Sequence, residues 1–387
     1  MALTVGTLYK KSAVYKMSLV AGQSGLANVV EWVHIIETVQ GAGFLHGHEL
    51  VITEGILGAD PGELLAFVKV VYQKEASGLI LNTGKYLLDI PGEVLDFCNE
   101  HQFPLFTIPW EIPLVDVTKF YYKTIFEQEA HNDSLITIFK NLLFGIGEAD
   151  AQIRQMVRMG IPSQASFQIL CISTDLARDT DQCIRVMDRV SMICRRTAAR
   201  IHDQFLAFHY QEDQVVVLVD YSPQERQQFL SELVKKFSME KILGHIFMGI
   251  SDEVRGLRQQ SQNFKKALSA CGIARKKKEN ILYYDDLGLY KLLVNVSDPQ
   301  VTEEFYRETF GRIEAYDREN GTKLLEFLEV YIRCNGSPGD VSECCFIHRN
   351  TVNNYVKRIE KILDLDLMSW EGRAKLYVAY MMKQLEG

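Results

Sequence analysis

Residues 347–359 read Ile-His-Arg-Asn-Thr-Val-Asn-Asn-Tyr-Val-Lys-Arg-Ile, and this stretch decides the fold of the C-terminal part of the chain. Apolar residues recur at helical spacing and predict a buried helix face of Val352, Tyr355, Val356, Ile359 and Ile362. The opposite face is polar and carries Arg349, Asn350, Asn353, Asn354, Lys357 and Lys361. Arginine binds guanine and asparagine binds adenine through paired hydrogen bonds, whereas asparagine is a poor helix former. The stretch therefore predicts a helix whose exposed face contacts nucleic acid.

The residues before this helix favour a helix-turn-helix. An apolar pattern over Thr322–Ile332 predicts a helix that ends at the breaker cluster Asn335–Gly339. A short helix over Asp340–Cys345 follows, and two residues separate it from the polar-faced helix, 348–361. In a helix-turn-helix the second helix enters the major groove with its N-terminal residues at base edges. The expected DNA-binding residues are His348, Arg349, Asn350, Thr351, Asn353, Asn354, Lys357 and Arg358. A small helical subdomain with a solvated face is the alternative.

Length and composition fit a protein with several domains. The chain has 387 residues, of which 47% are hydrophobic and 24% charged, an ordinary globular composition. A net charge of −8 argues against a protein that coats nucleic acid nonspecifically. Residues 348–361 hold four basic side chains and one glutamate, a net charge of +3. Because this local charge is modest, we expect a homodimer or higher homo-oligomer that uses two half-sites on double-stranded DNA.

Apolar runs alternate with helical patterns in the N-terminal part. The expected strands are Val29–Val39, Leu50–Ile52, Gly78–Leu81 and Leu105–Ile108, and the expected helices are Pro61–Glu75 and Pro91–His101. This alternation predicts an α/β domain with a parallel sheet. In such folds ligands bind outside the carboxyl ends of strands. The expected ligand-binding residues are Thr53, Glu54, Gly55, Asn82, Thr83 and Gly84.

A long helical pattern over Val115–Leu143 follows this domain. One helix of that length would span about 40 Å and would suit a signalling and dimerisation linker. The alternative is a pair of core helices, the second of which would be capped by Asn132–Ser134.

The middle of the chain predicts an α+β domain. The expected elements are a strand at Phe167–Ile172, a helix at Asp181–Arg200, a hairpin of Gln204–Tyr210 and Gln214–Val219 around the turn Gln211–Asp213, a helix at Pro223–Phe237, a strand at His245–Ile250 and a helix at Val254–Ala274. The basic run Arg275–Lys278 comes next and is expected to be a solvated loop, with auxiliary contact to the DNA backbone as the alternative.

Several of these segments resemble one family of bacterial transcription factors, the purine catabolism regulator (PucR/CdaR) family. The run Ile347–Val352 with Lys357–Glu360 and Leu365–Leu367 is similar to its C-terminal helix-turn-helix. Gly47–Gly55, Ser77–Ile80 and Phe103–Trp110 resemble its effector-sensing domain. The resemblance implies a ligand-responsive DNA-binding regulator, with a purine-related or other nitrogenous metabolite as a possible effector.

The chain departs from the family pattern at several positions. Val341-Ser342 replaces Thr-Ala, Cys345 replaces leucine, and Asn354-Tyr355 replaces Tyr-Arg, which removes one arginine from the DNA-binding helix. Glu54 replaces the usual threonine in the expected pocket and favours a cationic or hydrogen-bond-donating effector. The operator sequence is therefore not carried over from relatives.

The middle domain resembles the degenerate GGDEF-like domain of the same family. Gln211-Glu212-Asp213-Gln214-Val215 stands where a working cyclase has Gly-Gly-Asp-Glu-Phe, so the glycines and paired acids needed for nucleotide and metal are missing. Dimerisation or signal relay is the expected role. The expected domains are an N-terminal sensing domain at 1–113, a helical linker at 114–145, a GGDEF-like domain at 146–295 and a helix-turn-helix domain at 300–387.

The eight cysteines lack paired spacing, the chain opens without a signal-peptide pattern, and no run approaches the ~18 apolar residues of a membrane helix. A cytoplasmic protein is expected. Cys344, Cys345 and His348 lie close in sequence with Cys334 upstream, but their spacing fits small buried residues and a groove-facing histidine better than metal ligands. We expect no catalytic residue, no cofactor and no metal. The alternatives are a metabolic enzyme that uses the N-terminal α/β domain and an interaction module that binds no DNA.

Overall fold

The computed structural model describes residues 3–59, 61–177, 180–293, 296 and 299–386, so the expected domain limits at 1, 295 and 387 lie outside the described residues. The chain forms two compact units, Met1–His245 with Glu253–Phe264, and Ile246–Asp252 with Lys265–Gly387. Among the described residues, no helix has the length and apolarity that a membrane crossing requires.

The N-terminal part forms a five-stranded sheet of order β1-β5-β4-β3-β2. Strands β2 to β5 run parallel, and β1 is antiparallel to β5. Its elements are α1 (Val5–Lys11), β1 (Ser18–Ala21), β2 (Trp32–Ile35), α2 (Val39–Ala42), β3 (Glu49–Thr53), α3 (Pro61–Gln73), β4 (Gly78–Thr83), α4 (Gly92–Glu100) and β5 (Leu105–Pro109). The predicted parallel α/β architecture is confirmed.

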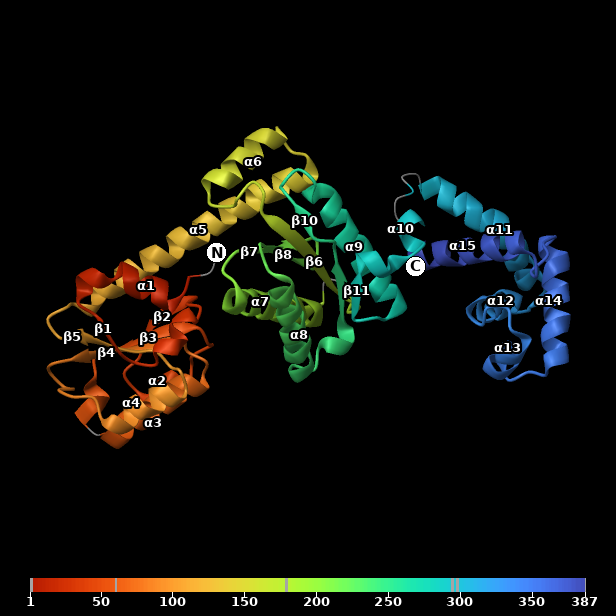
Figure 1. The fold of residues 1–387 in the computed structure, drawn as a ribbon. Coiled ribbons are helices and arrows are strands. Elements are labelled where there is room, and N and C mark those ends of the chain that lie inside the picture. Colours follow the sequence, from red (N-terminus) through yellow and green to blue (C-terminus); the bar gives the residue numbers. More distant parts are fainter. Residues whose placement is uncertain (1–2, 60, 178–179, 294–295, 297–298, 387) are drawn as a thin grey trace. The chain divides into compact units, whose positions relative to one another are not determined.

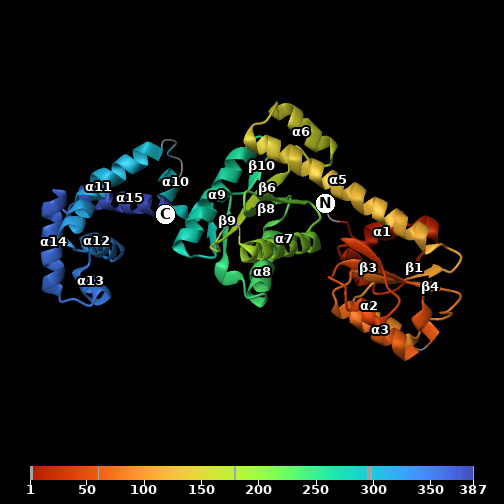
Figure 2. The same ribbon diagram turned by 180° about the vertical axis from the view of Figure 1, so that it is seen from behind.

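Helices cover both faces of this sheet. Helices α2, α3 and α4 lie on one face, while α1 and the beginning of α5 (Leu114–Phe144) lie on the other (Figure 1, Figure 2). Val51 and Leu81 pack with the α2–α4 layer, and the alternate residues Ile52 and Ile80 pack with α1 and α5. Because successive side chains of a strand point to opposite faces, β3 and β4 are buried on both sides.

The strand predicted at Val29–Val39 is wrong in its length. Strand β2 ends at Ile35, and the side chain of Thr38 accepts a hydrogen bond from the Gly41 backbone N–H. Threonine at this position is a favoured helix N-cap, so the chain leaves the sheet and begins α2. The apolar pattern continued through this change and concealed it.

The connection after the sheet is one helix of 31 residues, α5. Ser134 Oγ donates to the Ala130 carbonyl at 2.8 Å, and Gln128 Nε2 donates to Asn132 Oδ1 at 3.2 Å. The polar residues that could have capped a second helix instead bond within the same helix. The single-helix interpretation is therefore confirmed over the pair of helices.

The central sheet is mixed and has the order β11-β9-β6-β8-β7, with β10 paired to β6. Its elements, with the helix α6 before it, are α6 (Ala149–Arg158), β6 (Ser166–Thr174), α7 (Asp181–Ile201), β7 (Phe205–Tyr210), β8 (Asp213–Val219), α8 (Pro223–Met239), β9 (Ile246–Ile250), β10 (Val254–Arg255), α9 (Gln260–Lys277) and β11 (Ile281–Tyr283). The expected α+β class is confirmed. The β7–β8 hairpin is tighter than predicted, because Tyr210 pairs with Asp213 and leaves a turn of Gln211 and Glu212.

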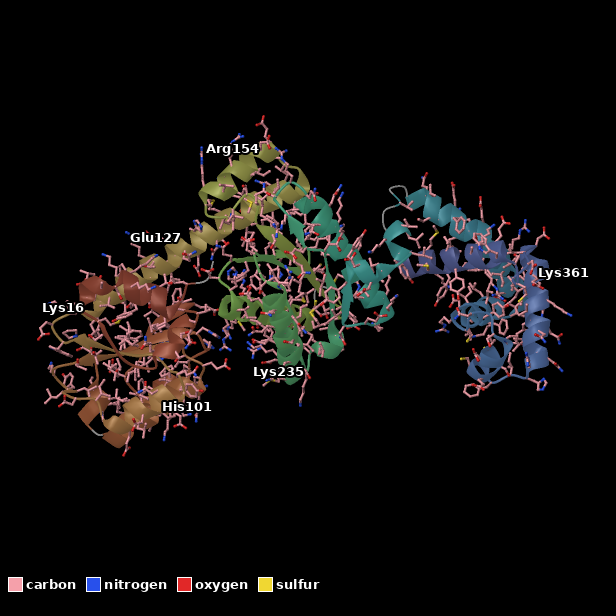
Figure 3. The ribbon with its side chains drawn as sticks, in the orientation of Figure 1. Lys16, His101, Glu127, Arg154, Lys235 and Lys361 are labelled. Carbon is pink, nitrogen blue, oxygen red and sulfur yellow. The ribbon has the colours of Figure 1, made fainter. Side chains whose placement is uncertain are left out.

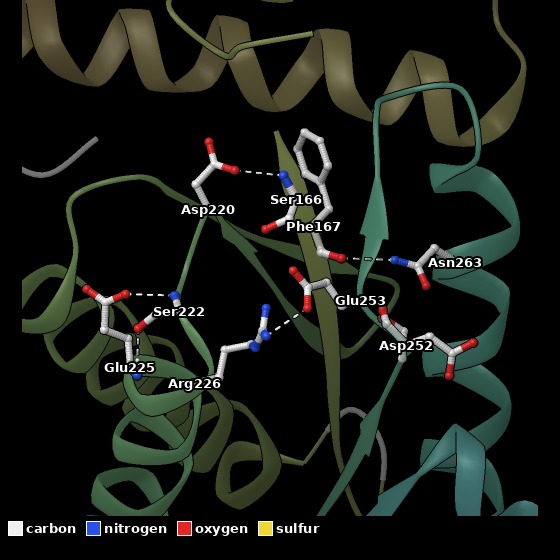
Figure 4. A network of polar contacts seen from close by, with 10 residues as sticks. Ser166, Phe167, Asp220, Ser222, Glu225, Arg226, Asp252, Glu253 and Asn263 are labelled. Carbon is white, nitrogen blue, oxygen red and sulfur yellow. Dashed lines mark hydrogen bonds and ion pairs between the residues drawn. The ribbon is translucent and has the colours of Figure 1, made fainter. Parts of the chain in front are cut away.

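Polar contacts fix the ends of these central elements (Figure 4). Asp220 Oδ1 accepts from the Ser166 backbone N–H at 2.7 Å and joins the end of β8 to the start of β6. Ser222 and Glu225 form a reciprocal capping box at the start of α8. Such a box satisfies two otherwise unpaired N–H groups.

The helix predicted at Val254–Ala274 is wrong at its beginning. Val254 and Arg255 form β10, and Gly256 follows with a φ of 80°, a conformation that ends regular structure and suits glycine. Helix α9 begins later and continues through Lys277, so most of the basic run is helical, not a loop. Lys277 lies over the ring of Tyr290, with Nζ 4.9 Å from the centroid.

The C-terminal part is entirely helical over its described residues after 299. Its helices are α11 (Pro299–Asn320), α12 (Leu324–Arg333), α13 (Pro338–Cys345), α14 (Arg349–Leu363) and α15 (Trp370–Glu386), preceded by the short α10 (Tyr290–Leu293). They enclose one core, to which Phe310, Leu328, Val341, Val352, Ile359 and Leu376 contribute. The predicted order of long helix, short helix, tight turn and polar-faced helix is confirmed.

Candidate nucleic-acid interface

Helices α13 and α14 meet through a tight turn. Ser337 caps the start of α13, with Oγ accepting from the Asp340 N–H. The C-cap of α13 is Phe346, whose φ is 53°. Ser342 Oγ donates to the Ile347 carbonyl at 2.6 Å, and His348 Nδ1 accepts from the Asn350 N–H at 3.2 Å at the start of α14. Side-chain hydrogen bonds thus fix both sides of the turn, which presents the N-terminus of α14 outward.

Helix α14 has the two faces that its sequence predicts. Val352 and Ile359 are fully buried, and Tyr355 packs edge-on against Phe327 with the ring centroids 5.0 Å apart. The exposed side chains are Arg349, Asn350, Asn353, Asn354, Lys357 and Lys361, the last of which is labelled in Figure 3. Among the described residues, no side-chain hydrogen bond engages Asn353, Asn354 or Lys357. These groups are free to bind bases or phosphates.

Three other expected DNA-binding residues are less free, because they are partly buried or contact other parts of the protein. His348 is exposed but caps α14, and Thr351 is half-buried. Arg358 is exposed, yet its Nε donates to Tyr316 Oη at 3.1 Å and its guanidinium carbon lies 5.0 Å from the centre of that ring. Arg358 therefore ties α14 to α11.

Asp317, next to Tyr316, supports the same part of the domain and was missed by the sequence reasoning. Its carboxylate accepts from the backbone N–H groups of Leu324 and Leu325, each at 2.9 Å, and from Thr322 Oγ1. Burial opposes ionisation of this carboxyl, but the hydrogen bonds outweigh it and lower the pKa of Asp317. The residue holds the start of α12, and no spacing rule points to a cap seven residues upstream.

The expected ligand-binding residues lie at the carboxyl edge of the N-terminal sheet. Thr53 ends β3 and is followed by Glu54 and Gly55, and Asn82 and Thr83 end β4 before Gly84. These two ends are adjacent because β3 pairs with β4 in parallel register. Gly55 has a φ of 77°, and a Cβ there would lie 2.5 Å from the Asn82 carbonyl oxygen. A glycine is needed for this close approach of the loop after β3 to the end of β4.

The same edge contains Glu37, which the sequence reasoning placed within a strand. Its carboxylate accepts from Thr53 Oγ1 at 2.8 Å and from the Glu54 N–H at 2.7 Å. Burial raises the pKa of Glu37 despite these two hydrogen bonds. Glu37 therefore belongs to the candidate effector site.

Asn82 differs from the other residues of this site. It is 2% exposed, and its Oδ1 has no hydrogen-bond partner among the described residues. Its register partner in β5 is Ile108, which packs on the face of α1 and α5, whereas Thr53 alternates with Ile52 and lies on the other face. The six expected residues therefore gather at one edge but do not share one face of the sheet.

Metal-binding chemistry is not supported in the described residues, where no group of three or more His, Cys, Asp or Glu side chains could hold a metal ion. Cys334 and Cys344 do come together, with their sulfurs 3.7 Å apart.

Three family models match successive parts of the chain. Residues 7–125 match the purine catabolism regulatory protein-like family, 146–273 the GGDEF-like domain, and 324–382 the PucR C-terminal helix-turn-helix domain.

Several proteins that are similar to this chain are named as transcriptional activators or regulators. The chain is 24% identical over 312 residues to the proline-responsive transcriptional activator PutR of Bacillus subtilis, covering 76% of this chain and 70% of the relative. It is 30% identical over 142 residues to the carbohydrate diacid regulator of Escherichia coli, covering 37% of this chain and 35% of the relative. It is 29% identical over 109 residues to the purine catabolism regulatory protein of Bacillus subtilis, covering 28% of this chain and 20% of the relative.

Among solved structures, a regulator of polyketide synthase expression from Bifidobacterium adolescentis matches with a TM-score of 0.32 and 14% identity. The match covers 64% of this chain and 96% of that chain.

Proposed function

This chain belongs to the PucR/CdaR family of helix-turn-helix transcription regulators, a family of DNA-binding proteins and not of enzymes, and from that premise we propose that it is a ligand-responsive dimer that reads DNA with α14. In this proposal the effector binds at the carboxyl edge of the N-terminal sheet. The long helix α5 and the GGDEF-like domain relay effector binding to the DNA-binding domain. We further propose the domain limits 1–113, 114–145, 146–295 and 300–387 for these parts.

One observation carries the DNA-reading proposal, namely the unengaged polar face of α14. Asn353, Asn354 and Lys357 are exposed on the side opposite Val352 and Ile359. Side chains that neither pack nor bond within the fold, on a helix presented by a tight turn, are what base and phosphate contacts require.

The test is the salt dependence of DNA binding. Full-length protein is titrated against a duplex that it selects from a random-sequence library, at several salt concentrations. Specific binding predicts an affinity that falls steeply with salt, in proportion to the phosphates contacted. If no duplex is selected and no fragment is bound even at low salt, α14 serves packing alone and the proposal is wrong.

The proposed effector has hydrogen-bond donors. Among the described residues, Asn82 Oδ1 is a buried acceptor without a donor. On the other face of the same sheet edge, Glu37 offers a half-buried carboxylate beside Thr53 and Glu54. A buried acceptor left unpaired costs roughly 1–3 kcal/mol, which a ligand N–H group would recover. One relative is named for its response to proline and another for purine catabolism, which supports a nitrogenous metabolite.

The effector is sought by thermal unfolding with a panel of amino acids and purines. A ligand that binds the folded protein raises the unfolding midpoint. Asn82→Leu replaces the unpaired amide by an apolar group of similar size, so the variant should be at least as stable without ligand. It should lose the ligand-induced rise. A ligand whose effect persists in Asn82→Leu binds elsewhere.

The dimer is proposed because each α14 supplies little charge. Two half-sites roughly double the phosphate contacts and the salt slope of one. Effector binding would then shift the population between two domain arrangements that differ in the spacing of the recognition helices. Sedimentation of the protein–duplex complex measures the number of subunits bound to each duplex and so tests the proposed dimer. One subunit per duplex would overturn it.

A further inference from the structure

Two cysteines lie side by side at the base of the helix-turn-helix. Cys334 is the C-cap of α12, and Cys344 lies in the last turn of α13. The Cys334 thiol donates a hydrogen bond to Cys344 Sγ, and the two sulfurs are 3.7 Å apart. The chain between them reverses direction at Asn335 and Gly336, both of which have positive φ. This turn, and not sequence proximity, brings the two thiols together.

Accessibility separates this pair from most other cysteines of the chain. Cys98, Cys171, Cys183, Cys194 and Cys271 are buried, whereas Cys344 is exposed and Cys334 is half-buried. An exposed thiol with a second thiol in contact is the arrangement found at oxidation-sensitive sites, because the second sulfur traps the first oxidation product.

We propose that Cys334 and Cys344 form an oxidation site that a hydroperoxide closes to a reversible disulfide, and that this closure weakens DNA binding. The Cys344 thiolate attacks the terminal peroxide oxygen, the O–O bond breaks, and the leaving alkoxide or hydroxide takes a proton to become alcohol or water. Cys344 is then a sulfenic acid. Cys334 sulfur attacks the Cys344 sulfur, the S–O bond breaks, and the hydroxide combines with the Cys334 proton as water. Two thiols lose two electrons and the peroxide gains them.

The structure distinguishes the roles of the two sulfurs. Burial, and then the hydrogen bond to Cys344, raise the pKa of Cys334, so its thiol stays protonated and donates to the neighbouring sulfur. Cys344 is the more exposed sulfur and meets the oxidant first. Cys345 packs partly against the core, and the Cys334 thiol donates to Cys344 and not to Cys345, so Cys345 is a natural control.

Closure would act on the DNA-binding face through α13. A disulfide bond is about 2 Å long, so the two sulfurs must approach by more than 1 Å. The movement involves the last turn of α13, from which Phe346 and Ile347 lead into α14. This second half of the inference rests on the proposed function of α14, whereas the disulfide itself does not.

The disulfide is tested on the full-length protein treated with hydrogen peroxide. Cys334, Cys344 and Cys345 all fall between Arg333 and Arg349, so trypsin leaves them in one peptide. Further cleavage after Glu343 separates Cys334 from the other two, and the fragments remain joined only through a disulfide of Cys334. The proposal predicts joined fragments in the wild type and in Cys345→Ser, and separate fragments in Cys344→Ser and after dithiothreitol. Separate fragments in the wild type, or joined fragments in Cys344→Ser, would overturn it.

The consequence is tested with the same samples and the duplex selected by the reduced protein. Peroxide should weaken binding by about tenfold, within the usual range for coupling between two sites, and dithiothreitol should restore it. Cys334→Ser and Cys344→Ser should bind equally well with and without peroxide, while Cys345→Ser should respond like the wild type. A mapped disulfide with unchanged affinity would overturn the regulatory half. Failure to obtain any bound duplex would instead count against the proposed function.

Discussion

The guanidinium of Arg358 lies against the ring of Tyr316, 5.0 Å from its centroid, and donates to the phenol oxygen across 42 residues of sequence. Arg358 belongs to α14 and Tyr316 to α11, so this contact fixes the polar-faced helix on the rest of its domain. The neighbouring Lys357 is exposed and has no such partner among the described residues. The two adjacent basic residues therefore have different roles.

We predict that Arg358→Ala lowers the stability of the C-terminal domain by about 1 kcal/mol, through loss of the ring contact and the hydrogen bond. Lys357→Ala should leave stability unchanged but reduce the salt slope of DNA binding by about one per subunit. Denaturant unfolding and salt titrations of both variants check this. Equal reductions of the salt slope would instead make Arg358 a phosphate contact.

Phe346 gives a second prediction, because it is 95% exposed with a φ of 53°. The left-handed conformation costs a residue with a Cβ roughly 1–2 kcal/mol, and the exposed ring recovers nothing through burial. Phe346→Gly should therefore unfold at the same or a higher denaturant concentration, while Phe346→Ala keeps the Cβ and gains nothing. A loss of about 3 kcal/mol, as for a core phenylalanine, would disprove the exposed position.

The loop contact at Gly55 gives a third prediction. Gly55→Ala places a Cβ 2.5 Å from the Asn82 carbonyl oxygen in a backbone conformation that disfavours alanine. We expect a loss of at least about 1–2 kcal/mol in the stability of the N-terminal domain. Gly92→Ala is the matched control, since nothing lies within 4 Å of its Cβ position. Thermal unfolding of both variants measures the difference, and equal midpoints would contradict the close approach.

The fourth prediction concerns Glu37 and the pH dependence of stability. Burial raises the pKa of its carboxyl in the folded protein, so the folded state holds this proton more tightly than the unfolded chain. The contribution of Glu37 to stability is therefore present below the pKa of an ordinary glutamate and is lost as pH rises through the raised value. The Glu37→Gln variant has no carboxyl group to ionise at this position. An ordinary glutamate has a pKa of about 4, so the stability of the variant relative to the wild type should improve as pH rises from about 4 to about 7. A constant difference across that range would contradict the raised pKa.

Strands and buried helix faces could be predicted from the sequence where they follow from a local pattern of apolar residues. Val352 and Ile359 lie two helical turns apart on one face of α14, and periodicity alone located them in the core. The buried strand β3 was equally plain from its apolar run. Local periodicity failed where a capping side chain ended the element, as Thr38 did after β2.

Long-range partners were beyond the reach of sequence patterns. Glu37 joins the effector-site candidates because it bonds to Thr53, sixteen residues later, and it stood inside an expected strand. Two helices, α12 and α13, lie in the sequence between Tyr316 and its partner Arg358. Such pairs depend on how elements pack, which no spacing rule specifies.

The most direct test compares two double variants in binding to the duplex selected by the wild-type protein. Arg349→Ala/Asn350→Ala removes two exposed side chains from the first turn of α14. Arg318→Ala/Asn320→Ala removes the same residue types from the end of α11. A bidentate base contact contributes about 1–3 kcal/mol, so the first variant should bind at least about tenfold more weakly at equal stability. The second should bind like the wild type. Equal affinities for both variants would contradict the assignment of α14 as the DNA-reading helix.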